Sequence, residues 1–286
     1  MTTASDAKQQ FKNRLSQNAV VQLAAKLLYM LSRVGLPPII LSYVSLEEYG
    51  IWAICFIVIS YLGMSTFGIA NVYIRYTAEY HARHDTEAIN RLLTTGLAVT
   101  VPLCMGLLAL LGLGMPVLLD AFNVAPQLRE TAAILIFATA AAMMLDLSFG
   151  AFSHVLGGLQ LMVRQTGIWV VSFLLETALI IALLLAGLGV YALLWAFVIR
   201  YLLATWLSAR ACFQVLPGLT LGPRHFDRKL LTLFYRFGGV VQISGMLSMI
   251  LYSIEKVIAG AFIGVRATGL FDLGEKLPVM SSQITS

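Results

Sequence analysis

Charged residues are scarce in this sequence, and their scarcity excludes an ordinary soluble fold. Only 12% of the 286 residues are charged, whereas 59% are hydrophobic and the mean hydropathy is +0.85. A typical soluble domain is about 25% charged and about 45–50% apolar, so a globule of this composition would expose large apolar patches. A bilayer removes that difficulty, because its hydrocarbon core solvates apolar side chains. The composition therefore predicts an integral membrane protein.

Cysteine is also rare, and no pattern of metal ligands is evident. Cys55, Cys104 and Cys212 lie in apolar runs without metal-ligand spacing, so we expect small core residues and no metal or other cofactor. The net charge of +5 does not indicate nucleic acid as a partner. The cations are spread thinly between apolar runs, which is the placement that membrane topology requires.

Eight long apolar runs predict helices that cross the membrane. Each is apolar over about 20 residues, the length a helix needs to span a bilayer, whereas a barrel strand alternates over about ten. We therefore expect an all-α polytopic membrane protein with about eight transmembrane helices. The expected spans are about 18–44, 50–73, 92–118, 129–152, 167–187, 190–212, 234–263 and 267 onward.

The loops carry an uneven distribution of positive charge. If the N-terminus is cytoplasmic, the outer loops hold only Arg129 and Arg266. The positive-inside rule therefore predicts a cytoplasmic N-terminus. Twelve cations fall on the cytoplasmic side, namely Lys8, Lys12, Arg14, Arg75, Arg83, Arg91, Arg164, Arg210, Arg224, Arg228, Lys229 and Arg236.

A faint internal repeat suggests two related lobes. The letters VVQL at 20–23 correspond to VVQI at 240–243, and YGI at 49–51 corresponds to TGL at 268–270. A repeat of six helices keeps both copies in one orientation, related by an axis along the membrane normal. We therefore expect a six-helix N-terminal lobe with a cytoplasmic tail at 1–232. Residues 233–286 would begin a second lobe with helices seven and eight, so we expect the chain to lack about four helices of it.

Several short motifs resemble polysaccharide exporters of the multidrug/oligosaccharidyl-lipid/polysaccharide exporter superfamily. LEEYGIW at 46–52 resembles the start of their second helix, and FGIA at 67–70 with IRYTAEY at 74–80 resembles its exit. GGLQ at 157–160 is similar to the second inner loop, and 254–264 to the end of the seventh helix. The order and spacing of the motifs along nearly the whole chain are more specific than any one motif. Thr66 stands where the family often has an acidic residue.

The resemblance implies two helical lobes around a cavity that opens alternately to each side of the bacterial inner membrane. Its cargo would be an oligosaccharide linked to undecaprenyl pyrophosphate, destined for O-antigen, capsule or exopolysaccharide. The partners would be membrane lipids and other polysaccharide-assembly proteins. No cofactor is implied.

Two cations in the first span are candidates for holding an anionic cargo. Lys26 and Arg33 are seven residues apart, which places them on one helical face about 10 Å apart along the axis. A lipid pyrophosphate carries about two negative charges, which two such cations would neutralise through charge-assisted hydrogen bonds. Alternatively, Lys26 reaches the headgroups and Arg33 pairs with a carboxylate.

Two further cations are candidate substrate ligands. Arg75 lies at the inner end of the second span, where a headgroup anchor is the alternative role. Lys256 follows Glu255 directly, so the two side chains point about 100° apart. One of them would face the cavity and the other a neighbouring helix.

Three charged residues fall near the middles of spans four to six. A charge at the bilayer centre costs roughly 2.5–3.5 kcal/mol on insertion scales, so it usually faces a cavity or a partner. Glu176 and Arg200 lie twelve residues before and after Leu188, at similar depth on antiparallel helices, and we expect them to pair. The pair would fix helix packing or take part in a proton relay. Asp146 is the candidate for a group that titrates during transport.

Several functions remain open at this point. A drug/cation antiporter or a peptidoglycan-precursor flippase would share the fold, and a non-transporting membrane scaffold would share the composition. A membrane enzyme such as a polysaccharide polymerase is less favoured, because it needs an acid/base or metal constellation at a water-accessible face. The outer loops are too short to hold one and the inner loops lack acidic pairs, so we predict no catalytic residues.

Overall fold

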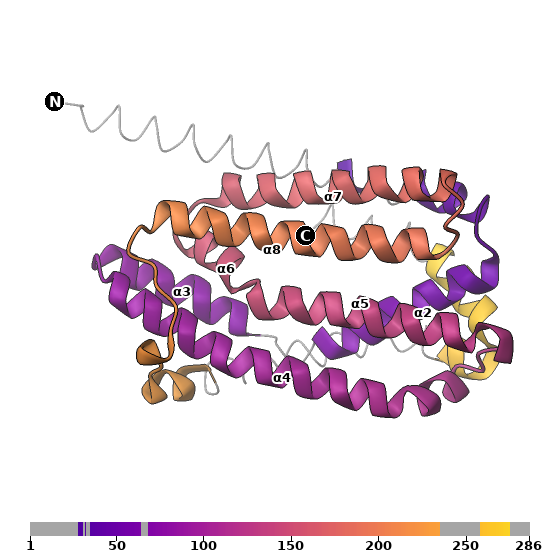
Figure 1. The fold of residues 1–286 in the computed structure, drawn as a ribbon, viewed down its shortest axis with the longest axis horizontal. Helices are drawn as coiled ribbons and strands as arrows, with labels where there is room; N and C mark the ends of the chain where they lie inside the picture. Colours follow the sequence, from indigo (N-terminus) through magenta and orange to yellow (C-terminus); the bar gives the residue numbers. More distant parts are fainter. Residues whose placement is uncertain (1–27, 31, 33–34, 64–67, 235–257, 275–286) are drawn as a thin grey trace.

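The chain forms a bundle of long helices joined by short turns (Figure 1). The computed structural model describes residues 28–30, 32, 35–63, 68–234 and 258–274. Within these residues, five helical segments are long and apolar enough to cross a membrane. This confirms the prediction of an all-α polytopic membrane protein. The five segments are Leu46–Gly63, Thr86–Ala121, Pro126–Gly158, Met162–Leu185 and Tyr191–Val215.

Helix α2 (Leu46–Gly63) begins with a capping box. The backbone N–H of Ser45 donates to the Glu48 carboxylate at 3.0 Å, and the Ser45 hydroxyl accepts from the Glu48 N–H at 3.2 Å. Each residue thus satisfies a backbone donor that the helix leaves free. Glu48 belongs to the LEEYGIW stretch, so one acidic position of that motif has a local structural role.

The expected continuous span at 50–73 is wrong. Helix α2 is described as far as Gly63, and a separate helix α3 (Ile69–Ala82) begins after Gly68. Gly68 has a φ of 88°, a left-handed conformation that glycine adopts without a Cβ clash and that interrupts a right-handed helix. The hydropathy of the sequence continues through this region, so the pattern of apolar residues alone did not reveal the break.

Helix α4 (Thr86–Ala121) is the longest described helix and contains the expected span 92–118. It starts where the Asp85 side chain accepts a hydrogen bond of 2.8 Å from the Ala88 N–H, an N-cap. Its 36 residues are about 54 Å long, whereas a bilayer core is about 30 Å thick. One end of α4 therefore extends beyond the membrane.

The fourth expected span, 129–152, is also corrected. Helix α5 (Arg129–Phe149) bends at Gly150 and continues as helix α6 (Ala151–Gly158), six residues further than expected. A Cβ at Gly150 would lie 2.5 Å from the Asp146 carbonyl oxygen, so only glycine allows this bend. The bend redirects α6 toward α3 and α8, against which it packs.

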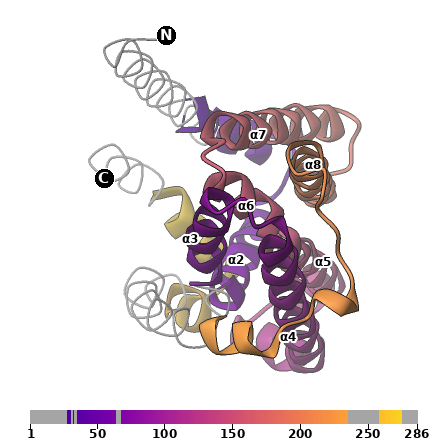
Figure 2. The ribbon, with the colours of Figure 1, turned by 90° about the vertical axis from the view of Figure 1, so that its left-hand side faces the viewer.

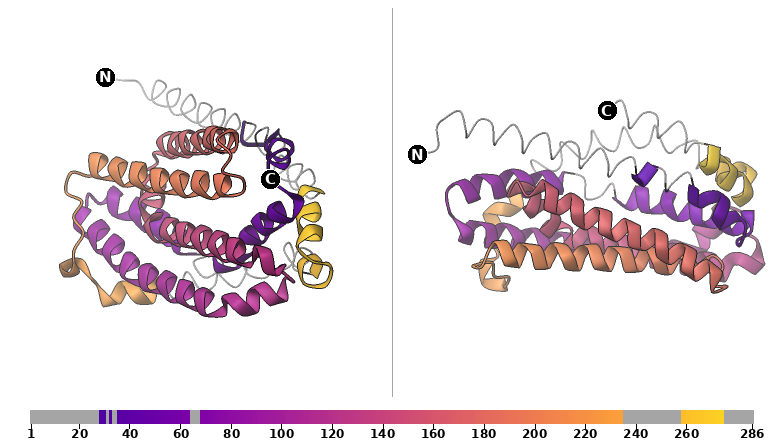
Figure 3. Two further views of the ribbon diagram at one scale, coloured as in Figure 1. Left: turned by 45° about the vertical axis from the view of Figure 1, so that its right-hand side comes forward. Right: turned by 90° about the horizontal axis from the view of Figure 1, so that it is seen from above.

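Helices α7 (Met162–Leu185) and α8 (Tyr191–Val215) form the expected tight antiparallel pair. They lie side by side in both views of Figure 3. Gly187 and Gly189 take positive φ values of 82° and 56° in the five-residue link, which allows the reversal. Because the two helices are antiparallel, residues that are equally far from the link in sequence lie at equal depth along the bundle.

The two ends of the bundle differ in charge. One end, here called the basic end, carries the turns at 83–85 and 159–161 and the loop at 216–227, and it faces the viewer in Figure 2. The other, called the opposite end, carries the turns at 42–45, 122–128 and 186–190. Among described residues, Arg129 and Arg266 are the cations of the opposite end. The basic end carries Arg83, Arg91, Arg164, Arg210, Arg224, Arg228 and Lys229.

Residues 258–274 pack against the opposite end of the bundle. They form a short π-helix η4 (Ala259–Ile263) and a helix at 265–274. The Asn123 side chain donates to the Ala261 carbonyl at 2.9 Å, and the Tyr49 hydroxyl donates to Asp272 at 3.2 Å. These bonds join the segment to the C-terminal turn of α4 and the first turn of α2.

Two glycines make this contact close. A Cβ on Gly50 would collide with the backbone carbonyl of Val265, and a Cβ on Gly269 would lie 3.2 Å from the Gly50 Cα. Gly50 and Gly269 are the central residues of the YGI and TGL triplets, whose similarity predicted a repeat. The two copies of the triplet therefore touch each other.

A glycine at the basic end offers a test of helix packing. A Cβ on Gly158 would lie 2.7 Å from both the Ile74 carbonyl oxygen and the Thr77 Cβ, so Gly158→Ala must separate α6 from α3. We expect a loss of about 1–3 kcal/mol of unfolding free energy, measured as a lower melting temperature in detergent. Gly167→Ala, at an open helical position, is the control. Equal melting temperatures for the two variants would contradict the close packing.

Candidate functional site

A polar layer separates two apolar cores inside the bundle. One core lies toward the opposite end and includes Ile54, Leu135 and Phe197. The other lies toward the basic end and includes Leu92 and Leu156. The segments of α5, α7 and α8 between these cores contain buried polar residues, and buried polar groups in a membrane protein need partners or water. These residues are Ser148, Ser172, Glu176, Arg200 and Ser208.

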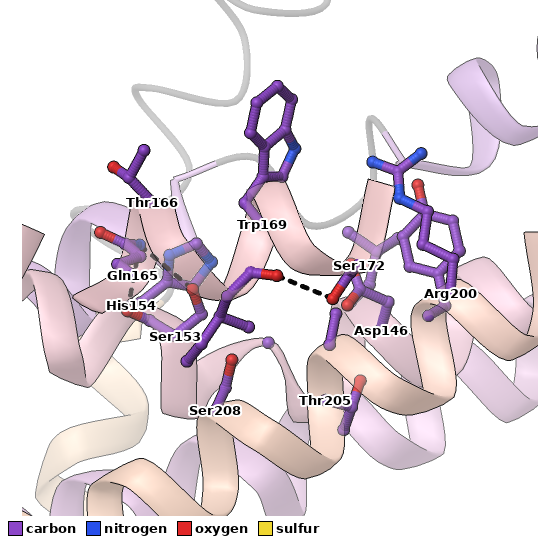
Figure 4. Close-up of a pocket in the computed structure, with 15 residues that line it drawn as sticks. Asp146, Ser153, His154, Gln165, Thr166, Trp169, Ser172, Arg200, Thr205 and Ser208 are labelled. Atoms are coloured by element: carbon purple, nitrogen blue, oxygen red, sulfur yellow. Dashed lines mark hydrogen bonds between the residues drawn. The ribbon is translucent and has the colours of Figure 1, made fainter. Parts of the chain in front are cut away.

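A cavity of about 440 Å³ lies in this layer, between α5, α6, α7 and α8 (Figure 4). Its volume falls within the range of small-molecule sites and exceeds what one ion or water molecule occupies. Most of its lining side chains carry hydroxyl, amide, imidazole or charged groups. The polar and aromatic lining residues are Asp146, Ser153, His154, Gln165, Thr166, Trp169, Ser172, Arg200, Tyr201, Thr205 and Ser208.

An ion pair lies at one edge of the cavity. Arg200 Nη1 donates to Glu176 Oε2 at 2.7 Å, and the two side chains are only 10% and 6% exposed. The expected contact between Glu176 and Arg200 is thereby confirmed. The Arg200 guanidinium also lies 5.2 Å from the centre of the Tyr201 ring, a cation–π contact. These contacts hold the guanidinium in place at the α7–α8 interface.

Asp146 adds a second carboxylate to the same site. It lines the cavity, lies within electrostatic range of Arg200 and faces the Thr205 hydroxyl. Within the described ranges it forms no ion pair with a contact of 4 Å or less, and Thr205 Oγ1 is buried without a hydrogen bond of good geometry. With both carboxylates ionised, Asp146, Glu176 and Arg200 together carry one net negative charge. Such a site can accept a proton without leaving a cation unpaired.

A second cavity of about 520 Å³ adjoins the first. It lies where α2 ends and α3 begins, and the two cavities share Leu147, His154 and Tyr201 as lining residues. Phe56 and Phe197 form part of its wall, and Asn71 and Ser60 supply polar groups. The left-handed backbone at Gly68 thus borders a cavity, which is where irregular backbone is tolerated at membrane depth.

The other predicted site residues are distributed as follows. Arg75 is exposed on α3, with its guanidinium 5.6 Å from the centre of the Tyr76 ring, and it lines neither cavity. Lys26, Arg33, Glu255 and Lys256 lie outside the described residues. Their assigned roles remain predictions.

Three cavity residues were not anticipated from the sequence. His154 borders both cavities, Gln165 donates to the Ser153 carbonyl at 3.1 Å, and Thr205 faces Asp146. His154 and Gln165 lie next to other polar residues, and Thr205 lies in an otherwise apolar run. Such a residue more often satisfies its own backbone than serves a site, so only the packing of four helices distinguishes these from the rest.

Comparisons with known proteins identify the family. A family model described as polysaccharide biosynthesis protein matches residues 15–286. Among curated proteins, none matches the sequence. A solved structure described as the inward-facing conformation of a multidrug resistance MATE family transporter of the MOP superfamily has a similar fold, with a TM-score of 0.60 and 15% identity.

The fold match covers 89% of this chain and 56% of that transporter, so the chain spans just over half the length of its neighbour. Because the family match extends over nearly all of the sequence, the chain belongs to the polysaccharide biosynthesis protein family.

Proposed function

We propose that the protein flips a lipid-linked oligosaccharide across the bacterial inner membrane for the biosynthesis of a cell-surface polysaccharide. The observation that carries this proposal is a charged, polar cavity between two apolar cores in a member of a polysaccharide biosynthesis family. A purely structural bundle has no need for such a cavity, because a buried charge at membrane depth is costly unless it faces a cavity or a partner.

The contact of residues 258–274 supports alternating access as the mechanism. Close packing at Gly50 and Gly269 holds residues 265–270 against α2 at the opposite end. Opening to that side would require this contact to separate. The basic end would face the cytoplasm and take up the cargo there, in agreement with the positive-inside rule.

The cargo would be an oligosaccharide on undecaprenyl pyrophosphate. Lys26, Arg33, Arg75 and Lys256 are the cations that would hold its pyrophosphate. Glu255 would pair with one of them or line the passage. Membrane lipids and other polysaccharide-assembly proteins would be the partners.

Asp146 would couple this movement to a proton gradient. Its carboxylate lies in a cavity beside a guanidinium that is already neutralised by Glu176. Protonation of Asp146 therefore changes the net charge of the site without breaking the ion pair. Hydroxyl groups of Thr205 and Ser208 line the same cavity and would help a proton or water to reach the carboxylate.

The fold neighbour favours a second candidate, transport of a cationic drug in exchange for an ion. Net negative charge in the cavity would suit such a cargo. A third candidate function is that of a membrane scaffold without transport activity. This function would give the cavity no role. The cargo's charge and lipid anchor distinguish the first two candidates experimentally.

The location of lipid-linked saccharide in cells tests the proposed cargo. Cells that lack the protein are expected to accumulate lipid-linked saccharide that periodate added outside spheroplasts cannot oxidise. Expression of the protein should restore its oxidation. If the saccharide is equally accessible with and without the protein, while a cationic dye is extruded only with it, the second candidate is correct.

Replacement of Asp146 tests the coupling. Asp146→Asn keeps the size of the side chain but cannot take up and release a proton, so we expect flipping in vesicles to lose its response to a pH gradient. Asp120→Asn, an equal change at an exposed carboxylate of the opposite end, is the control. A response in Asp146→Asn equal to that of the control would assign the coupling elsewhere.

A further inference from the structure

The basic end carries two exposed arginines that have no carboxylate partner among the described residues. Arg164 lies in the first turn of α7, and Arg210 lies one turn from the end of α8. Arg164 donates instead to the amide oxygen of Gln214, which is four residues after Arg210 on the same face of α8. Arg164 therefore reaches the last turn of α8 on the face that also carries Arg210.

Two other exposed arginines of the described chain, by contrast, pair with carboxylates. Arg83 binds Glu79 at 2.7 Å, and Arg129 binds Asp120 at 2.5 Å. Their charge is largely neutralised by these carboxylates. The described residues supply no carboxylate to Arg164 or Arg210, so their charge is available to a ligand.

The face of α8 beside these arginines has the order of a membrane interface. Leu202, Trp206 and Arg210 follow at intervals of four residues, so they form one stripe about 12 Å long. Leu202 and Trp206 are 49% and 55% exposed, and the Arg210 guanidinium lies 5.4 Å from the centre of the Trp206 ring. Along the stripe, an aliphatic, an aromatic and a cationic side chain follow one another. This is the order in which acyl chains, the interface and the headgroups follow one another in a membrane leaflet.

This stripe is separate from the cavity. At 100° per residue, it is turned roughly 130° around α8 from the cavity residues Tyr201, Thr205 and Ser208. A ligand on the stripe would thus lie on the outer surface of the helix pair, and its binding does not depend on what the cavity transports.

We infer that Arg164, Arg210 and Trp206 form a binding site for the phosphate headgroup of an anionic membrane lipid, whose acyl chain lies along Leu202. The arginines donate charge-assisted hydrogen bonds to the phosphate, and the Trp206 ring lies at the level of the glycerol. A soluble phosphate would gain nothing from the exposed apolar part of the stripe, so the lipid is the ligand that fits both halves. Bound at this position, it would hold α7 and α8 together at their basic ends.

Lipid-dependent unfolding of the purified full chain tests this site. Phosphatidylglycerol titrated into detergent micelles is expected to raise the melting temperature more than phosphatidylcholine with the same acyl chains. In the double variant Arg164→Gln/Arg210→Gln, the apparent affinity for phosphatidylglycerol should fall roughly tenfold or more. Arg83→Gln/Arg129→Gln removes the same charge from two paired positions and should retain the response.

Two further results decide the inference. In the unaltered protein, a photoreactive phosphatidylglycerol should label α8 near residues 202–214. Equal loss of response in both double variants would mean that only net charge matters, and labelling elsewhere would place the lipid at another site. Competition by free glycerol phosphate at millimolar concentration would mean a phosphate site without a lipid requirement. Each of these three outcomes would overturn the assignment.

Discussion

Replacing Arg200 by glutamine is expected to destabilise the protein strongly and to abolish transport. Arg200 is the described cation of the polar layer, and its loss leaves Glu176 buried without its positive partner. Removal of one partner from a buried ion pair costs about 3–5 kcal/mol, because the other charge is left uncompensated. We expect lower abundance in the membrane and a lower melting temperature in detergent.

The double variant Arg200→Gln/Glu176→Gln separates the charge effect from packing. With both charges replaced by amides, it should recover part of the lost stability, so the two single changes will not be additive. Arg129→Gln removes an arginine from the exposed pair with Asp120, and exposed pairs contribute only about 0–1 kcal/mol. If Arg200→Gln is as stable as Arg129→Gln, the ion pair does not organise the site.

A bulky residue at Gly50 is expected to hold the opposite end open and to stop transport. Even a single Cβ there would meet the Val265 carbonyl, so Gly50→Leu must separate α2 from residues 265–274. We expect a cysteine at position 265 to react slowly with a membrane-impermeant maleimide in the otherwise unaltered protein, because Val265 is 8% exposed. In the Gly50→Leu background the same cysteine should react about tenfold faster or more, as local opening exposes it.

Two features allow the labelling rate to be assigned to the cysteine at position 265. The native Cys55, Cys104 and Cys212 are all buried, so they contribute little background. Gly114→Leu places the same side chain in open space on α4 and is the matched control. Rapid flipping by Gly50→Leu, with the cysteine still protected, would show that the glycine contact is not a gate.

Sequence reasoning located the charged site better than it located the helix ends. The pairing of Glu176 with Arg200 followed from equal spacing about a short link, because helix geometry and a tight turn together fix relative depth. The five described spans were likewise expected, since an apolar run of sufficient length has few alternatives in a membrane.

The breaks inside the helices were not predictable from apolar periodicity. Gly68 and Gly150 interrupt runs that remain hydrophobic, and many of the 23 glycines lie within continuous helices. Gly68 is distinguished by its left-handed backbone conformation, and Gly150 by its close approach to the Asp146 carbonyl oxygen. Both features depend on how the neighbouring helices pack. The partners of Asp146 were missed for the same reason, because Arg200 and Thr205 lie on a helix that is not adjacent in sequence.

Reconstituted flipping tests the central claim most directly. The purified chain in liposomes should move a fluorescent undecaprenyl-pyrophosphate saccharide between leaflets, so that more than the outer-leaflet half becomes accessible to an external lectin or quencher. Asp146→Asn should flip equally with and without a pH gradient, whereas Asp120→Asn should match the unaltered protein. Saccharide that stays confined to its original leaflet in the presence of the folded protein would contradict the proposed function.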